Sequence, residues 1–454
     1  MLPEDTLLEI FDFYRLDAMK ARGRPRPWKW HHLAHVCRKW RLVLSISPRR
    51  LDLQILCKSG APIERVLASW GTLPLIVRFK GSPKTKSLPE NIVTALRHPD
   101  RVREIELGLT STTVGSIVDS MKKPFQTLEC IRIEIKDTEE PSLLFSDTFL
   151  GASAPRLRVI ELRGISFPFP EIKKVISSTN NLVELNLSGI PKTGYFSADD
   201  LVTALSTSAQ LRRLEVRFHY PASLPTQSEA SPPLRRATFP SLAFLGFHGA
   251  SEYLEEFVPR VDFPALCNIT MGLFNQVFFE IPQFCRSIPL LKAFNSPTEL
   301  MVTPGADRVG LSFTQKGKHV AYGHFFLGTK CRRLDWQLSF VTQVSSQLSP
   351  LLSSVRSLII NKPYHLLTGE EDVESTQWLE LFQPFTHVRK FSAFEQLVPG
   401  IVQALFTEDM ATGVLPELTQ LSLEGYRKSP VVLEATEKFV VARRLSGRTI
   451  HLSN

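Results

Sequence analysis

The sequence predicts an α/β protein in two parts: a small all-helical module at the N-terminus and a curved solenoid of strand–helix repeats behind it. Two short amphipathic stretches among the first fifty residues predict the helices. The pattern Leu-x-x-Leu-x-Leu recurs along the rest of the chain and predicts the strands. Successive copies lie about 24 to 33 residues apart, which is the length of one strand with its covering helix.

The N-terminal module is predicted to contain two helices, each with one apolar stripe. The first stripe follows the spacing i, i+3, i+4 and i+7 in Leu7, Ile10, Phe11 and Tyr14, and the second comprises Leu33, Val36, Trp40 and Val43. Pro3 suits a helix start, and Glu4 and Asp5 complement the positive end of the helix dipole. Helices this short cannot form a core alone, so we expect them to pack on each other and on a partner.

Several short motifs in this module carry a resemblance to a known family. They are Leu2-Pro3-Glu4, Leu7-Leu8-Glu9-Ile10-Phe11, Leu33, Val36-Cys37-Arg38-Lys39-Trp40, Pro48 and Leu51. Residues 1–50 resemble an F-box, and more narrowly the large F-box family of basidiomycete fungi, whereas the remainder of the chain matches that family weakly. One departure is residues 15–30, an insertion relative to the usual F-box spacing, which Pro25 and Pro27 predict to be a loop.

The resemblance implies a function. An F-box docks on the Skp-type adaptor of cullin–RING (SCF) ubiquitin ligases, so the chain is expected to be a substrate-recognition subunit with adaptor, cullin and a protein target as partners. The residues expected to contact the adaptor are Leu2, Pro3, Leu7, Leu8, Ile10, Phe11, Val36, Cys37 and Trp40, although some of them must pack between the helices instead.

The second part, residues 51–454, is predicted to be a leucine-rich-repeat-like solenoid. It opens with a strand near Leu51 to Ile55, a helix at 63–70 and a strand at 75–79. The repeated strands are expected at 103–107, 128–133, 157–162, 182–187, 211–216, 242–247, 266–271, 333–336, 355–360, 388–393 and 418–423. In each copy the last two apolar positions share one strand face and point into the core. Each unit then buries its apolar face only against its neighbours.

Intervening stretches carry helix signals and breaks. Ile92, Val93 and Leu96 share one helix face, and residues 197–200 form a capping sequence for a helix at 201–205. Residues 220–240, rich in Pro and Ser, predict a loop insertion. Between 271 and 334 the pattern degrades, with candidate copies at 291–294 and 309–313. A helix at 430–446 with Leu433, Phe439 and Val440 inward, stopped by Gly447, precedes a last strand at 450–452.

Composition excludes several protein classes. With 43% hydrophobic and 22% charged residues the chain is globular rather than disordered, and no apolar run reaches the length of a membrane span. Its acidic start lacks the features of a signal peptide. Six cysteines stand singly, as is typical of buried thiols in a reducing compartment, so a cytoplasmic or nuclear location is expected.

Catalytic and metal-binding patterns are missing from the sequence. It contains no phosphate-binding loop, dinucleotide fingerprint, H-E-x-x-H or G-x-S-x-G motif. His31 and His35 have the i, i+4 spacing of a metal pair, but no cysteine or carboxylate lies alongside in ligand spacing apart from Cys37, which is expected on the adaptor-binding face. We therefore expect neither an enzyme nor a cofactor or metal site.

The open strand face remains as a binding surface. The residue between the two inward positions of each strand, and the one after them, would point away from the helices. The possible target-binding residues on this basis are Glu161, Arg163, Asn186, Glu215, Arg217, His248, Asp335 and Asn361. Their mixed charge suits a protein partner better than a phosphate backbone.

A second reading comes from the basic run between Arg15 and Arg41, which carries Trp28 and Trp30. It would make the chain a nucleic-acid-associated or general protein-interaction scaffold without a ligase role. A solvated insertion loop explains the same charges, and no known nucleic-acid-binding motif surrounds them, so nucleic-acid binding is the less favoured interpretation.

Overall fold

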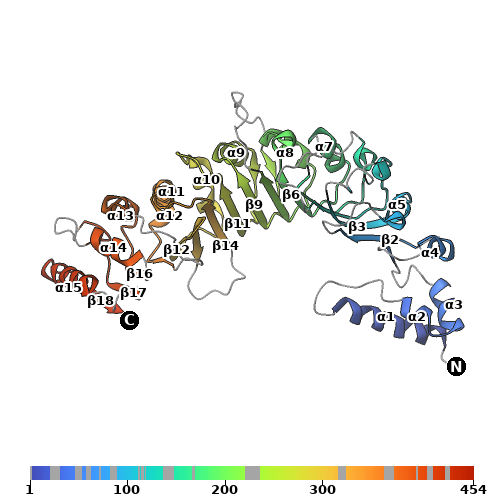
Figure 1. Cartoon of the computed structure of the whole chain (residues 1–454), viewed down its shortest axis with the longest axis horizontal. Helices are drawn as coiled ribbons and strands as arrows, with labels where there is room; N and C mark the ends of the chain where they lie inside the picture. The colour runs from blue at the N-terminus through green and yellow to red at the C-terminus, as the bar shows by residue number, and fades with distance from the viewer. Residues whose placement is uncertain are drawn as a thin grey trace. The chain divides into compact units, whose positions relative to one another are not determined.

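The computed structural model describes residues 3–20, 31–46, 54–57, 63–70, 73–81, 89–110, 113, 117, 119–135, 148–165, 169–219, 236–314, 324–361, 373–394, 397–405, 413–424 and 430–453. The chain divides into two compact units. Unit 1 comprises Met1–Phe196 with Thr207–Ala209, and unit 2 comprises Ser197–Ser206 with Gln210–Asn454. In each unit, helices lie along one side of the strands (Figure 1).

The N-terminal module consists of α1 (Glu4–Lys20), α2 (His31–Ala34) and α3 (Arg38–Ile46). The carbonyl of Pro3 accepts the first helical hydrogen bond from Leu7 N at 3.1 Å. Arg41 Nε donates to the carbonyl of Ala34 at 3.1 Å and ties α3 to α2. Because α1 continues through residues 15–20, the expectation of a loop there is wrong, and residues 21–30 lie outside the described chain.

The described residues of unit 1 form six parallel strands in sequential order, as strand–helix repeats require. They are β1 (Ile55–Cys57), β2 (Leu75–Lys80), β3 (Val102–Leu109), β4 (Cys130–Ile135), β5 (Val159–Arg163) and β6 (Glu184–Ile190). The helical elements are α4 (Ile63–Ser69), α5 (Glu90–Leu96), η2 (Asp119–Met121), η3 (Phe149–Ala152), α7 (Phe169–Ser177) and η4 (Lys192–Gly194). Their inward side chains, such as Ile172 and Ile176 of α7, are buried.

Unit 2 has the strand order β7-β9-β11-β14-β13-β12-β15-β16-β17-β18. The strands are β7 (Arg213–Phe218), β9 (Phe244–Gly249), β11 (Asn268–Leu273), β12 (Glu299–Pro304), β13 (Val309–Thr314), β14 (His324–Thr329), β15 (Ser357–Ile360), β16 (Lys390–Phe394), β17 (Gln420–Glu424) and β18 (His451–Ser453). A separate pair joins β8 (Ala237–Thr238) to β10 (Val261–Asp262). Of the loop expected at 220–240, residues 237–238 form a strand, and residues 220–235 lie outside the described chain.

The helical elements of unit 2 cover the same sheet. They are α8 (Ala198–Leu205), α9 (Ser251–Phe257), η5 (Val258–Arg260), α10 (Pro282–Ser287), η6 (Ile288–Leu290), α11 (Leu334–Gln347), α12 (Ser349–Leu352), α13 (Ser375–Phe382), α14 (Val398–Leu405) and α15 (Pro430–Leu445). Ser197 caps α8 by accepting from Asp200 N, as the sequence predicts. Trp378, on α13, is 1% exposed and is the largest of the fully buried side chains.

In several repeats the first apolar residue has a structural role of its own. It closes a turn before the strand, as when Leu128 N donates to the carbonyl of Phe125 and Leu157 N donates to that of Ala154. The next amide then pairs with the previous repeat, for example Glu129 N with the carbonyl of Arg103 at 2.8 Å. Both leucines are fully buried. The solenoid-like α/β arrangement predicted from the repeats is confirmed within each unit.

The region from 271 to 334 departs from the predicted repeats. Residues 333–336, expected as a strand, begin helix α11, and residues 291–294 form turns. Leu334, Leu338 and Val341 are buried at i, i+4 and i+7, a helical period that a four-residue window cannot reveal. The expected strand at 309–313 exists, but β13 runs antiparallel to both β12 and β14. The strands β12, β13 and β14 therefore form an antiparallel three-stranded meander in place of regular strand–helix repeats.

The C-terminal helix corrects a further expectation. Phe439 is buried as predicted, but Leu433 is 42% exposed and Val440 is half-buried, because the buried stripe of the helix runs through Val432, Thr436 and Phe439. Arg443 is fully buried, donates to the carbonyls of Val414 and Leu415, and lies over the ring of Phe439. Gly447 ends the helix with a φ of 76°, in the left-handed region that favours glycine.

Candidate protein-interaction surfaces

The N-terminal module separates the expected adaptor-binding residues into two groups. Leu7, Leu8 and Phe11 are buried, and the ring of Phe11 meets the half-buried Trp40 edge-to-face at 5.0 Å between centroids. These three residues form the core of the module, so they are among the residues expected to pack between the helices rather than on the adaptor. The described part of the chain does not include Leu2.

The other expected residues are exposed. Pro3, Ile10, Val36 and Cys37 face solvent, with 58% of Val36 accessible. Cys37 precedes α3, and its sulfur and carbonyl accept from Trp40 N at 3.5 Å and from Arg41 N at 3.2 Å. Because α2 ends at Ala34 and α3 starts at Arg38, the single stripe predicted across 33–43 is divided between two helices.

Further apolar side chains of the module are exposed that the sequence analysis did not select. They are Phe13 (74%), Leu42 (55%) and Ile46 (66%), besides Tyr14 at 39%. Exposed large apolar side chains within one small module are typical of a surface that binds another protein. A helical wheel of α1 would have placed Phe13 opposite Leu7 and Phe11 and so identified it.

The open face of the sheet in unit 1 carries a column of charged and polar residues. Strand register places Arg78, Glu106, Arg132, Glu161 and Asn186 side by side on β2 to β6. The next column contains Glu134, Arg163 and Ser188. The predicted residues Glu161, Arg163 and Asn186 are therefore brought together, and Arg78, which the sequence analysis missed, extends their column. Asn186 is itself buried and accepts from Ser188 Oγ.

Ion pairs connect this column laterally. Arg78 contacts Glu104 at 2.9 Å and Glu106 at 3.1 Å. Arg132 contacts Glu161 at 3.2 Å, and the same carboxylate contacts Arg163 at 2.6 Å. These side chains are only partly exposed, at 15% to 48%. Opposite charges in alternation hold each other in place, so this face is ordered and electrically nearly balanced.

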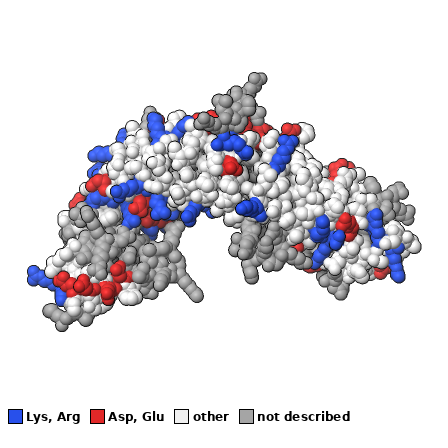
Figure 2. All heavy atoms as spheres, turned by 180° about the vertical axis from the view of Figure 1, so that it is seen from behind, with Lys and Arg blue, Asp and Glu red and all other residues white. Residues whose placement is uncertain are grey.

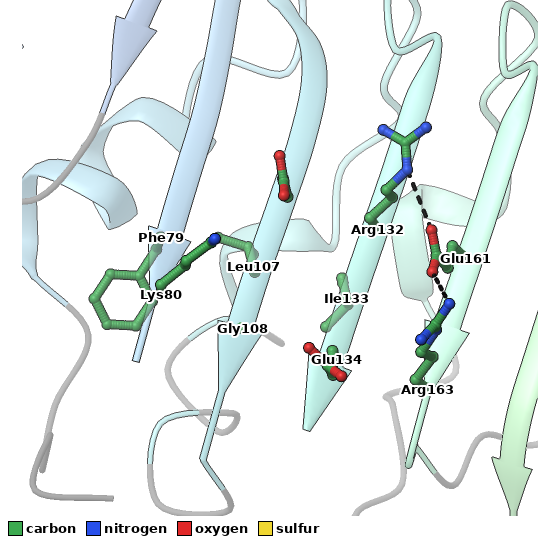
Figure 3. A pocket seen from close by; sticks show the side chains of 10 residues that line it. Phe79, Lys80, Leu107, Gly108, Arg132, Ile133, Glu134, Glu161 and Arg163 are labelled. Atoms are coloured by element: carbon green, nitrogen blue, oxygen red, sulfur yellow. Dashed lines mark ion pairs between the residues drawn. The ribbon is translucent and has the colours of Figure 1, made fainter. Parts of the chain in front are cut away.

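A hollow of about 240 Å³ lies over this network, lined by Phe79, Lys80, Arg132, Glu134, Glu161 and Arg163 among others. Figure 3 shows Arg132 reaching toward Glu161 from the neighbouring strand β4, and Arg163 reaching toward it from the same strand, β5. The hollow is shallow and bordered by charged groups, as suits a side chain of a protein partner better than an enclosed small molecule.

The open face of unit 2 contains three of the other predicted residues. Glu215 and Arg217 lie on β7, and His248 lies beside Arg217 on β9. Asn361 follows β15, and its amide nitrogen donates to Met301 Sδ at 3.4 Å. Asp335 does not belong to this face: it lies in the first turn of α11 and pairs with Arg333 at 2.6 Å. Phe326 of β14 occupies the register position beside Thr270 where Asp335 was expected.

Charge and thiol chemistry complete the description of the surface. Lys and Arg alternate with Asp and Glu over the side drawn in Figure 2. Burial raises the pKa of the Cys57, Cys130 and Cys285 thiols to about 12, so they remain protonated and unreactive near neutral pH. Among the described residues, no group of three or more His, Cys, Asp or Glu could hold a metal ion. None of the described helices could cross a bilayer.

Comparisons with known proteins do not identify a family for the chain. No protein-family model matches the chain, and no curated protein does. Among solved structures it is similar to the leucine-rich repeat-containing protein LegL7 from Legionella pneumophila, at 12% identity and a TM-score of 0.29. That match covers 76% of this chain and 99% of the other. The repeat architecture described above rests on the chain's own strand pairing.

Proposed function

We propose that the chain is the target-binding subunit of an SCF-type cullin–RING ubiquitin ligase. In this proposal the N-terminal module docks on the Skp-type adaptor, which connects to the cullin, and the open strand faces hold a protein target. The chain itself performs no chemistry. It raises the effective concentration of the target at the ubiquitin-transfer machinery by tethering both in one assembly.

The observation that carries the proposal is the division of apolar residues within the module. Leu7, Leu8 and Phe11 complete its core, yet Ile10, Phe13 and Val36 remain exposed. Apolar surface exposed on three short helices is stabilised when a partner covers it, at about 25 cal/mol per Å² removed from water. This division adds to the F-box resemblance of residues 1–50, which names the partner.

The structure allows surface and core to be tested separately. We expect Val36→Asp and Phe13→Asp to abolish co-purification of the full chain with a Skp-type adaptor, because each places a charge in the proposed interface. Trp40→Ala should also abolish it, since loss of the contact with Phe11 disorders the module. A matched control is Leu290→Asp, which alters an 83% exposed leucine of unit 2 and should leave adaptor capture unchanged.

The outcomes separate the possibilities. Undiminished capture by Val36→Asp and Phe13→Asp would refute the proposed docking surface. Undiminished capture by Trp40→Ala and by Leu2→Ala with Pro3→Ala would refute the adaptor assignment altogether. A scaffold that binds nucleic acid is less well supported, because the described strand face of unit 1 pairs its arginines with glutamates rather than presenting them to phosphates.

A further inference from the structure

Three charged residues alternate along β7 on the open face of unit 2. Arg213, Glu215 and Arg217 lie at i, i+2 and i+4, so their side chains share one side of the strand. The Glu215 carboxylate contacts Arg213 at 2.8 Å through one oxygen and Arg217 at 2.6 Å through the other. The glutamate side chain is 5% exposed, whereas those of the arginines are 41% and 50% exposed.

Neighbouring residues on β9 fix this arrangement. The guanidinium carbon of Arg213 lies 3.7 Å from the centroid of the Phe244 ring, a cation–π contact. Gly246 lies beside Glu215 in the strand register, and a Cβ there would come within 3.0 Å of both Glu215 Cγ and the Phe244 ring. The absence of a side chain at 246 lets the carboxylate settle close to the sheet. The Arg213 guanidinium is therefore held by the Phe244 ring and by Glu215, and the Arg217 guanidinium is held by Glu215.

The site carries an excess of positive charge. Two arginines share one carboxylate, and His248 lies beside Arg217 with its Nδ1 3.2 Å from the carbonyl of Phe218. Burial, followed by the nearby cations of Lys330, Arg217 and His219, lowers the pKa of His248. In unit 1, by contrast, Arg78 and Arg132 each contact two glutamates.

We propose that Arg213 and Arg217, with His248 beside them, bind an oxyanion carried by a side chain of the protein target: a phosphate ester or a carboxylate. A guanidinium offers five N–H donors in a planar fork that matches such groups, and Glu215 occupies only part of each fork. Prior ordering of the two arginines reduces the entropy lost on binding. This inference rests on the proposed function, in which the strand faces hold a protein target.

Two labelled pentapeptides test the site by fluorescence anisotropy with the full-length chain at constant ionic strength. One has phosphoserine and the other glutamate at the centre of four alanines, with both ends blocked. We expect at least one peptide to bind, and the pair identifies whether phosphate or carboxylate is preferred. Arg213→Gln and Arg217→Gln should each weaken binding at least tenfold. Arg333→Gln, which removes a 66% exposed arginine paired with Asp335, should change it less than twofold.

Other outcomes would overturn the inference. One is that neither peptide binds the unaltered chain at millimolar concentration. Another is that Arg333→Gln weakens peptide binding as much as Arg213→Gln and Arg217→Gln do. A third is that a single-stranded oligonucleotide displaces the peptides and that its binding depends on the same arginines. Circular dichroism spectra should match between variants, and the melting temperatures of the two arginine variants should fall by only a few degrees, because each loses one partly exposed ion pair with Glu215. Adaptor capture should persist in both arginine variants, so failure of this site and failure of the proposed function remain distinguishable.

Discussion

Glu215→Gln should make the protein less stable while strengthening anion binding. The substitution keeps the shape of the side chain and removes the charge that holds Arg213 and Arg217. Because both arginines are about half exposed, each pair contributes roughly 0.5–1 kcal/mol after solvent screening. The free energy of unfolding should therefore fall by about 1–2 kcal/mol. Removing a negative charge about 5 Å from a bound anion favours binding by roughly 0.8 kcal/mol at the dielectric constant of water, or about fourfold.

Urea denaturation measures the first effect, and hydrogen exchange should locate it on β7 and β9. Peptide anisotropy measures the second. The matched control is Glu424→Gln, an exposed carboxylate at the end of β17 in the same unit, which should change stability by less than about 0.5 kcal/mol. Unchanged stability of Glu215→Gln would show that the carboxylate does not position the arginines. Weaker peptide binding would show that Glu215 is needed as a partner rather than acting as a competing anion.

Three further predictions follow from packing and titration. Gly272→Ala should lower the free energy of unfolding, measured by urea denaturation, by about 1–3 kcal/mol, because its Cβ would lie 2.6 Å from the His248 ring. In Gly413→Ala the added Cβ meets nothing within 4 Å, so this variant should not lose stability by such a clash. Iodoacetamide at pH 8 should alkylate the exposed Cys37, as read by peptide mass spectrometry, before the buried Cys57 and Cys285 and the partly buried Cys130, whose thiols have raised pKa values. The lowered pKa of His248 means that the unfolded chain binds its proton more readily, so stability should fall as pH drops below about 6.5, and His248→Gln should flatten that slope.

The repeat strands illustrate what could be read from the sequence. Strands β4 to β7, β9, β11 and β15 to β17 begin within two residues of the predicted starts. The Leu-x-x-Leu-x-Leu pattern combines a turn-closing leucine with a two-residue period, and both are local properties of the chain. The same period identifies which residues share the open face. The proximity of Glu161 to Arg163, and of Glu215 to Arg217, could therefore be predicted from the sequence.

Where local periods are ambiguous, only tertiary packing decides. Residues 333–336 taken alone fit the pattern of a strand, whereas the 14 residues of α11 that they begin show the period of a helix. The antiparallel direction of β13 depends on its pairing with β12 and β14. Tertiary packing also decides which residues of the N-terminal stripe are buried. Leu7 and Phe11 are buried and Ile10 is not, because burial depends on which residues of α2 and α3 pack against α1.

The sequence by itself determined the repeat unit, the alternation of its two faces and the amphipathic character of the N-terminal helices. Those properties follow from the φ/ψ preferences and side-chain periods of short segments. Only the tertiary structure decided which apolar side chains of the module remain exposed and which charged side chains pair between strands, as Arg132 does with Glu161. Such contacts join residues on different strands and helices, and their distances are set by strand register and packing rather than by position along the chain.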